Sequence, residues 1–254
     1  MKFKDVLPEE LKKKYNIEFE TKGLIKKLIQ FLEGGLAFGA EKTTMMSTLK
    51  VLRTIIETAS DQSQMQDFFD KAGATTMLLS VFSDSKNGVK DDELMNEFLS
   101  FWISLLEGGN LNVQKTIYKF CLTHQKSEVM FANFYSIIYE QISYLQLKTT
   151  MKNDAENHFK NLERSGIKGI ILEKLLRLLQ LFTEGHYLDL QNYLRYQTNS
   201  RNRYNMVEAV IELLRIYYSD LVQENYENIL RCLDTLNEFV QVKYCLIKLL
   251  ILHP

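Results

Sequence analysis

Histidine and cysteine are the side chains in this sequence best suited to catalysis or metal binding, and they are few. They are scattered along the chain at His124, His158, His186, His253, Cys121, Cys232 and Cys245. No histidine has a serine or cysteine partner at a spacing typical of a nucleophile and its base. A nucleophile elbow, a phosphate-binding glycine loop, zinc-ligand spacing and an EF-hand loop are all missing from the sequence. We therefore predict that the protein is not an enzyme.

Composition limits the remaining classes of function. The cysteines are odd in number and lie in apolar periodic segments, which indicates buried, reduced thiols of a cytosolic protein. The 31 basic and 32 acidic residues give a net charge of −1, so no positive surplus is available to bind nucleic acid. The longest apolar run, residues 245–252, contains Lys248 and is shorter than the roughly 20 residues that span a bilayer. We predict no nucleic-acid partner and no transmembrane segment in this chain.

Carboxylates near the ends of apolar segments are a second class of candidate ligand. Glu184 stands directly before Gly185, and its residue type and position are those of a surface carboxylate at a helix end. Glu238 fits an exposed position on an amphipathic helix. From the residues alone, both carboxylates are interpreted as ordinary surface groups.

Helices are the elements that must position these side chains. The two prolines, Pro8 and Pro254, stand near the ends of the sequence, so no internal proline interrupts a helix. Apolar residues recur at spacings of three and four, a pattern typical of helices, whereas alternating strand patterns are absent. Examples are Met45, Leu49, Leu52 and Ile56; Leu94, Phe98, Phe101, Trp102 and Leu105; Met130, Phe134, Ile137 and Ile138; Met206, Val210, Leu213, Leu214 and Tyr217; and Ile229, Leu233, Leu236 and Val240.

The succession of amphipathic helices predicts an all-α armadillo- or HEAT-like solenoid of about ten helices. Each helix has one broad apolar face that it cannot bury alone, and stacking neighbours bury such faces. Glycines are expected to end the helices, among them Gly34–Gly35, Gly108–Gly109 and Gly185.

Polar residues divide the predicted solenoid into modules. We expect a leading helical segment at 1–22, a first armadillo-like module at 23–147, a polar linker at 148–166 and a second helical module at 167–254. The apolar positions of residues 167–182 extend nearly around the helix. This helix is therefore predicted to lie in the middle of the stack.

Two segments in the same order resemble the cytosolic region shared by inositol trisphosphate receptors and ryanodine receptors. The denser match is Thr183–Gln197, which resembles a signature of the region called receptor-homology-associated. Upstream, the resemblance rests on Asp70–Ala74, Leu105–Asn110, Gln114 and Lys126–Glu128. It implies a regulatory solenoid of a homotetrameric calcium-release channel, on the cytosolic face of the endoplasmic reticulum. Such a solenoid transmits ligand and calcium binding toward a pore, which this chain does not contain. Its partners would be other channel domains or subunits.

The same resemblance implies a calcium role for Glu184 and Glu238, which align with two glutamates that bind the activating calcium ion in the family. Calcium takes six to eight oxygen ligands, so two carboxylates supply only part of its coordination shell. In the family a backbone carbonyl near the channel's C-terminal end completes the site, and that segment is missing here. Weak calcium binding by this chain alone is therefore expected. The sequence departs from the family at Thr183, Gly185 and Tyr187, where cysteine, asparagine and asparagine are usual.

The segment following Glu184 has two complementary interpretations. Leu190, Tyr193 and Leu194 have the helical spacing of core residues. The other face is expected to contact neighbouring parts of a large channel, as the resemblance implies, through Asp189, Gln191, Asn192 and Arg195.

An unrelated class of function stays open beside the channel. A free-standing helical-repeat adaptor would bind a protein partner through its concave surface, in the cytoplasm, without a channel or calcium role. The order of the two matching segments argues against this alternative.

Overall fold

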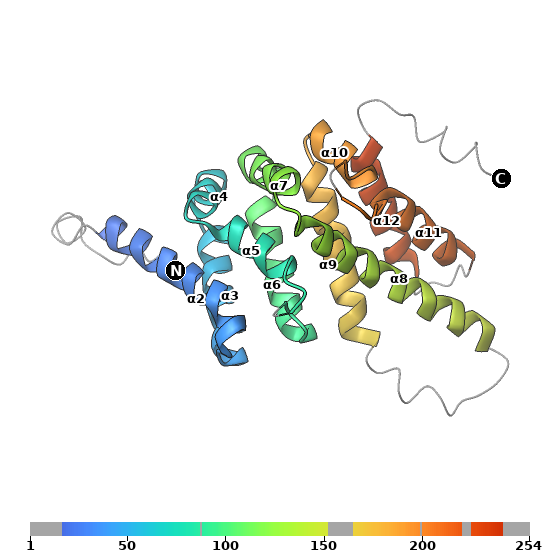
Figure 1. Ribbon diagram of the computed structural model, residues 1–254, viewed down its shortest axis with the longest axis horizontal. Helices are drawn as coiled ribbons and strands as arrows, with labels where there is room; N and C mark the ends of the chain where they lie inside the picture. The colour runs from blue at the N-terminus through green and yellow to red at the C-terminus, as the bar shows by residue number, and fades with distance from the viewer. Residues whose placement is uncertain (1–16, 87, 152–164, 199, 220–224, 241–254) are drawn as a thin grey trace.

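A computed structural model describes residues 17–86, 88–151, 165–198, 200–219 and 225–240, and in these ranges the chain forms eleven helices and no strand. The helices follow one another along the longest axis of an elongated molecule (Figure 1). The predicted all-α helical solenoid is confirmed. The helices are α2 (Ile17–Phe38), α3 (Lys42–Glu57), α4 (Gln62–Lys71), α5 (Ala74–Phe82), α6 (Asp92–Leu106), α7 (Leu111–Thr123), α8 (Ser127–Met151), α9 (Ser165–Thr183), α10 (Leu188–Arg195), α11 (Met206–Ser219) and α12 (Tyr226–Val240).

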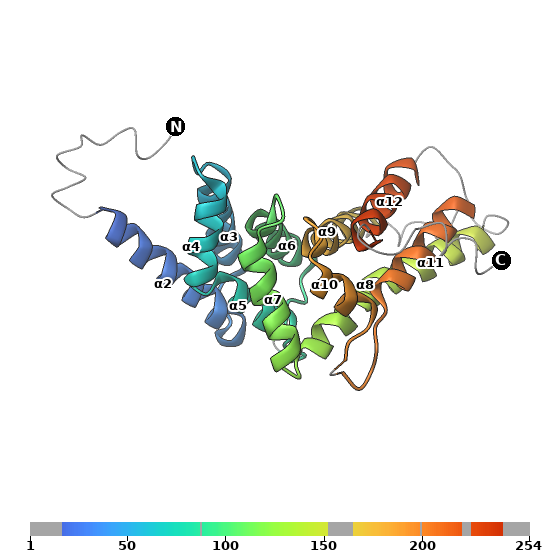
Figure 2. The ribbon, with the colours of Figure 1, turned by 90° about the horizontal axis from the view of Figure 1, so that it is seen from above.

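Three-helix repeats organise the stack. The first helices of the repeats, α3, α6, α9 and α12, contact one another in that order. The second helices, α4, α7 and α10, form a parallel row, and the third helices, α5, α8 and α11, form another (Figure 2). A period of three helices is that of armadillo repeats. In this arrangement α12 is the first helix of a fourth repeat.

Side-chain caps fix where several helices begin. Asp61, Asp91 and Asn110 precede α4, α6 and α7, and each accepts hydrogen bonds from backbone N–H groups two or three residues later. Such caps satisfy donors that the first turn of a helix leaves without partners. The starts of the second helices α4 and α7 are thus encoded locally.

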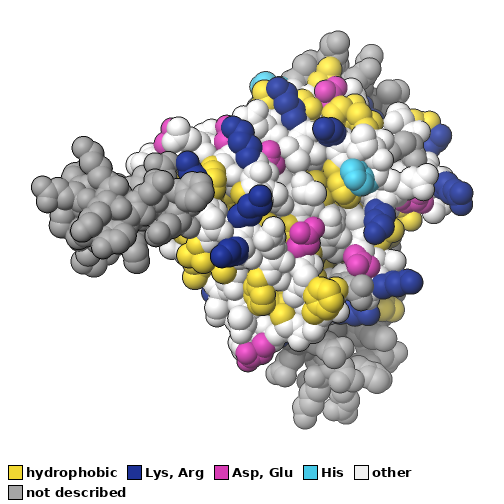
Figure 3. Space-filling model, turned by 60° about the vertical axis from the view of Figure 1, so that its left-hand side comes forward, with side chains coloured by type: hydrophobic (Ala, Val, Ile, Leu, Met, Phe, Trp, Pro, Cys, Tyr) yellow, Lys and Arg dark blue, Asp and Glu magenta, His cyan; other side chains and the backbone are white. Residues whose placement is uncertain are grey.

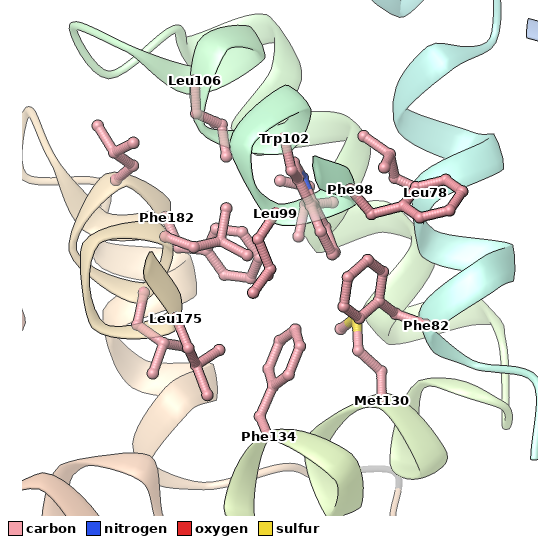
Figure 4. Packing of buried hydrophobic residues seen from close by; sticks show 14 of the residues in the cluster. Leu78, Phe82, Phe98, Leu99, Trp102, Leu106, Met130, Phe134, Leu175 and Phe182 are labelled. Carbon is pink, nitrogen blue, oxygen red and sulfur yellow. The ribbon is translucent and has the colours of Figure 1, made fainter. Parts of the chain in front are cut away.

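One continuous hydrophobic core runs through the repeats. Trp102 of α6 lies at its centre, with ring centroids 5.0 Å from Phe82 and 5.5 Å from Phe182 (Figure 4). Phe134 of α8 packs against the same indole at 6.2 Å. These rings belong to α5, α6, α8 and α9, so aromatic packing joins all three complete repeats.

The apolar patterns found in the sequence point into this core. Met45, Leu49, Leu52 and Ile56 are all buried in α3. The helix predicted for the middle of the stack is α9, which contacts α6, α8, α10 and α12. Both predictions are confirmed.

The division into modules remains a prediction. Buried residues form one cluster that extends from Ile25 to Phe239, across the boundary proposed at 148–166. Helix α8 continues to Met151, four residues into the predicted linker, and most of that linker lies outside the described residues. The predicted segment 1–22 overlaps α2, which begins at Ile17.

The prediction that Gly34–Gly35 end a helix is wrong. Helix α2 continues through both residues to Phe38 and ends before Gly39, whose φ of 71° is left-handed. A Cβ on Gly35 would lie 3.2 Å from the sulfur of Met45, so this glycine permits close packing of α3 on α2. The ends predicted at Gly108–Gly109 and Gly185 are confirmed by their positive φ angles.

Two of the three cysteines lie in the described core. Cys121 in α7 and Cys232 in α12 are buried thiols that form no disulfide, as predicted. Burial raises the pKa of each thiol to about 12, because the charged thiolate is disfavoured away from water. Cys245 lies outside the described residues. In the described part of the chain, no helix has the length and apolar character that a membrane span requires.

Candidate functional site

Three glutamates occupy corresponding positions at the C-terminal ends of stacked first helices. Glu107 directly follows α6, Glu184 directly follows α9, and Glu238 lies in the last turn of α12. Backbone carbonyls at such ends lack partners within the helix, and they give the end a partial negative charge. The ends of α6 and α9 therefore need hydrogen-bond donors and favour a nearby cation, whereas α12 is described as far as Val240.

A glutamine from the preceding second helix supplies donors at each end. Gln114 of α7 donates from Nε2 to the carbonyl oxygens of Leu181 and Glu184 at 2.9 and 2.8 Å. Gln66 of α4 makes the same two bonds at the end of α6, at 2.9 and 3.0 Å. Gln191 of α10 makes a 2.8 Å bond to a carbonyl in the last turn of α12. We call Gln66, Gln114 and Gln191 the glutamine latches.

The register of α9 and α12 places the ends of the two helices side by side. Arg231 Nη2 of α12 pairs with Glu173 Oε1 of α9 at 3.1 Å. Seven residues further along each helix stand Glu238 and Gln180, which are therefore at the same level. Glu184 is four residues beyond Gln180, about 6 Å along the axis. The structure thus brings the two predicted ligand positions to one end of neighbouring helices.

The side chain of Arg177 bridges the C-terminal ends of α6 and α9. Arg177 Nη2 lies 2.6 Å from Glu107 Oε1, and Arg177 Nη1 lies 3.4 Å from Glu184 Oε2. The two ends are in close contact. A Cβ added to Gly109, just after α6, would lie 3.1 Å from the carbonyl oxygen of Glu184. The carboxylate of Glu184 consequently faces a positive charge from its own helix.

Calcium fits this donor set in part. Glu184 and Glu238 offer carboxylate oxygens, and the side chain of Glu184 is 29% exposed. Gln180 Oε1 is a buried amide oxygen for which the described residues provide no hydrogen-bond partner. Carboxylate and amide oxygens are ligands that calcium accepts. No group of three or more His, Cys, Asp or Glu suited to hold a metal ion occurs in the described residues. Glu184, Glu238 and Gln180 could therefore supply only part of a calcium coordination shell. The metal role of both glutamates stays a prediction.

Helix α10 differs in one respect from the sequence interpretation. Leu190, Tyr193 and Leu194 are buried, as predicted for core residues. Gln191 was expected on the outer face, and this is wrong, since it is only 5% exposed. Its amide turns inward to bond the carbonyl of Glu238.

The role of the latches was missed in the sequence, although a signal exists. Gln66, Gln114 and Gln191 each follow an apolar residue and precede another by three positions. An isolated apolar-Gln-x-x-apolar pattern is common in amphipathic helices. Its recurrence in three short helices, each upstream of a glutamate at a helix end, is the informative feature.

The surface mixes both charges on the face that Figure 3 presents. Lysine and arginine side chains lie between acidic and apolar ones there. That face has no area of a single sign of the kind that binds phosphates along a nucleic acid.

The second part of the chain matches a known protein family. Residues 168–246, about a third of the chain, match the family described as RyR and IP3R Homology associated. The matched range includes Glu184, Gln191 and Glu238, and nearly all of α9 with α10, α11 and α12. The resemblance to the inositol trisphosphate and ryanodine receptor family indicated by the sequence is therefore confirmed for this part of the chain, residues 168–246.

Proposed function

We propose that this chain is a regulatory and coupling solenoid of an intracellular calcium-release channel. The single observation that carries the proposal is the family match at residues 168–246, downstream of the matching segments in α4–α8. In this role the protein has no catalytic chemistry of its own. It relays the effect of ligand and calcium binding toward a pore formed elsewhere.

Continuity of the first-helix row supports the coupling role. A relay between distant sites needs contiguous elements that move together. Ion pairs and hydrogen bonds join successive first helices at their surfaces, in addition to the shared core. These contacts are Arg53–Glu97 between α3 and α6, Lys174–Ser100 and Arg177–Glu107 between α6 and α9, and Arg231–Glu173 between α9 and α12.

We further propose that Glu184 and Glu238 hold calcium at the ends of α9 and α12. A divalent cation there would offset the repulsion between the two carboxylates and the partial negative charge at the end of α9. Bound calcium would supply a strong positive charge that draws the two ends together. With few ligands from this chain, the dissociation constant is expected at about 10⁻⁴ to 10⁻³ M.

The partners follow from the same proposal. Other domains or subunits of the channel would supply the missing oxygen ligands and tighten calcium binding. The place of action would be the cytosolic face of the endoplasmic reticulum membrane. Under the alternative proposal, an adaptor without a calcium role, the same surfaces would bind an unrelated protein in the cytoplasm.

Terbium titration of the purified chain tests the calcium proposal, with Glu107→Gln as the matched control. Terbium replaces calcium at oxygen sites and is luminescent. Glu184→Gln and Glu238→Gln each remove one charge with little change of shape, and each is expected to abolish saturable binding. Glu107→Gln removes the same charge one repeat away and is expected to retain binding. Equal binding by all three variants would contradict the proposed pair.

Hydrogen exchange with and without calcium tests the coupling role. Calcium is expected to slow amide exchange at the ends of α9 and α12, and to extend this protection into α6 through the stacked first helices. An adaptor without a calcium role predicts no change in any helix. Protection confined to α12 would contradict transmission along the row.

A further inference from the structure

The glutamine latches bond the backbone of the residues whose side chains are the candidate ligands. Gln114 donates to the carbonyl oxygen of Glu184, and Gln191 donates to that of Glu238, both at 2.8 Å. A backbone carbonyl and the carboxylate of the same residue share one Cα. Fixing the carbonyl therefore restricts where the carboxylate can lie.

Both latches are buried, so their bonds are not exchanged freely with water. Gln114 is 1% exposed and Gln191 is 5% exposed. The amide of Gln114 bonds two carbonyls three residues apart, those of Leu181 and Glu184, and so spans the last turn of α9. Helix ends that lack such partners fray, because their terminal carbonyls otherwise bond to water.

We propose that Gln114 and Gln191 are positioning residues for the calcium site, each holding one ligand glutamate in place from the neighbouring second helix. This inference rests on the proposed calcium role of Glu184 and Glu238. It assigns to α7 and α10 a function beyond packing. Groups that orient metal ligands typically change metal affinity by about 10- to 100-fold when they are removed.

The third latch provides a control within the same chain. Gln66 is 1% exposed and makes the same two bonds at the end of α6. The glutamate that it fixes, Glu107, pairs with Arg177 and is not a candidate ligand. A purely structural role would make the three glutamines equivalent, whereas a positioning role separates Gln66 from the other two.

The experiment compares Gln66→Met, Gln114→Met and Gln191→Met by terbium titration. Methionine has nearly the length of glutamine but cannot donate a hydrogen bond. Gln114→Met and Gln191→Met are expected to weaken terbium binding about tenfold or more, and Gln66→Met to leave it within about twofold. Titration is done at a temperature at which circular dichroism shows every variant to be fully helical.

The terbium luminescence lifetime in H₂O and D₂O provides a second measurement that stability alone does not change. The difference between the decay rates in the two solvents gives the number of water molecules bound to the ion. Displacing one carboxylate ligand is expected to raise that count in Gln114→Met and Gln191→Met, and to leave it unchanged in Gln66→Met. If a methionine variant does not fold, the shorter donor of Gln114→Asn or Gln191→Asn replaces it, with the same expectations and Gln66→Asn as control.

Three results would overturn the inference. Unchanged affinity and water count in Gln114→Met and Gln191→Met would show that the latches do not position the ligands. Equal weakening by all three variants would show a general structural effect. Absence of saturable terbium binding to the unsubstituted chain would overturn the calcium proposal itself, and this inference with it.

Discussion

The α6–α9 and α9–α12 junctions are built alike but place their cations differently. In the first junction, Arg177 lies between Glu107 and Glu184, at the ends of the helices. In the second, Arg231 pairs with Glu173, which is eleven residues and about 16 Å before Glu184. At the α6–α9 junction, the side chain of Arg177 thus lies between the helix ends. At the α9–α12 junction, the equivalent arginine, Arg231, lies away from them. Such a difference suits a structural junction beside one that responds to a metal ion.

The core side chains that join the first helices are expected to give the largest effect. Trp102 of α6 contacts Phe182 of α9 and is fully buried. Trp102→Ala should lower the free energy of unfolding by about 3–5 kcal/mol, because it leaves a cavity among packed rings. Leu236→Ala in α12 should cost about 2 kcal/mol, since the outermost helix can collapse onto the cavity. Urea denaturation followed by circular dichroism measures both, and a greater loss in Leu236→Ala would contradict the comparison.

Removal of the bridging cation is expected to strengthen calcium binding. Arg177 pairs with the carboxylate of Glu184, so under the proposed calcium role it would compete with calcium for this group. Both side chains are partly exposed, so solvent screening reduces their interaction, and Arg177→Gln should raise terbium affinity about fivefold. The control, Arg231→Gln, removes the same charge from α12 far from the helix end. A similar gain in both variants would show a long-range charge effect in place of direct competition.

Gln180 provides a smaller effect on stability, with the opposite sign to most core substitutions. Its buried Oε1 has no hydrogen-bond partner among the described residues. Gln180→Leu should therefore raise the free energy of unfolding in the absence of calcium by about 1 kcal/mol. Gln197, another glutamine of this region, donates to the carbonyl oxygens of Tyr193 and Tyr204, so Gln197→Leu should destabilise the fold. Chemical denaturation in EDTA measures the free energy of unfolding of both variants. Destabilisation by Gln180→Leu would contradict the absence of a hydrogen-bond partner for Gln180 Oε1 among the described residues.

Buried thiols are expected to report the smallest difference between the junctions. In a Cys245→Ser background, iodoacetamide should label native Cys232 faster than native Cys121, because α12 is the outermost described helix of the stack. Mass spectrometry of labelled peptides at pH 8 gives both rates. Faster labelling of Cys121 would indicate that the α6–α9 junction opens more readily than the α9–α12 junction.

The same thiols predict a pH dependence. Their folded pKa of about 12 lies above the ordinary 9.0, so the unfolded chain releases its thiol protons first as pH rises. Their contribution to stability is full below pH 9 and falls between pH 9 and 12. Replacing both by alanine should flatten this part of the stability profile in alkaline urea titrations.

Periodicity in the sequence predicted the fold because the spacing of apolar residues within each helix marks the face that is buried. The residues Met45, Leu49, Leu52 and Ile56 are all in the core, and α9 lies in the middle of the stack. Leu233 shows the limit of this reasoning. It continues the apolar pattern of α12 but is 44% exposed, because no further described helix covers that side.

The candidate ligands, Glu184 and Glu238, came from the family resemblance alone, and their calcium role stays a prediction. Nothing in the local sequence of Glu184 or Glu238 tells which helix lies beside it. The latches depend on contacts over long stretches of chain, so the side on which Gln191 packs could not be derived from one helix alone. Gly35 failed as a predicted helix end for a similar reason, since its small size serves contact with Met45 of the next helix.

A crystal structure of the chain with bound terbium, located by anomalous scattering, tests the central claim most directly. We expect one ion between the C-terminal end of α9 and the last described turn of α12, with oxygens of both Glu184 and Glu238 at about 2.3–2.6 Å, the range of calcium–oxygen ligand distances. The Gln114 and Gln191 amides should retain their bonds to the same two glutamates. An ion bound elsewhere, or carboxylates more than about 12 Å apart, too far for both to reach one ion at such distances, would contradict the account.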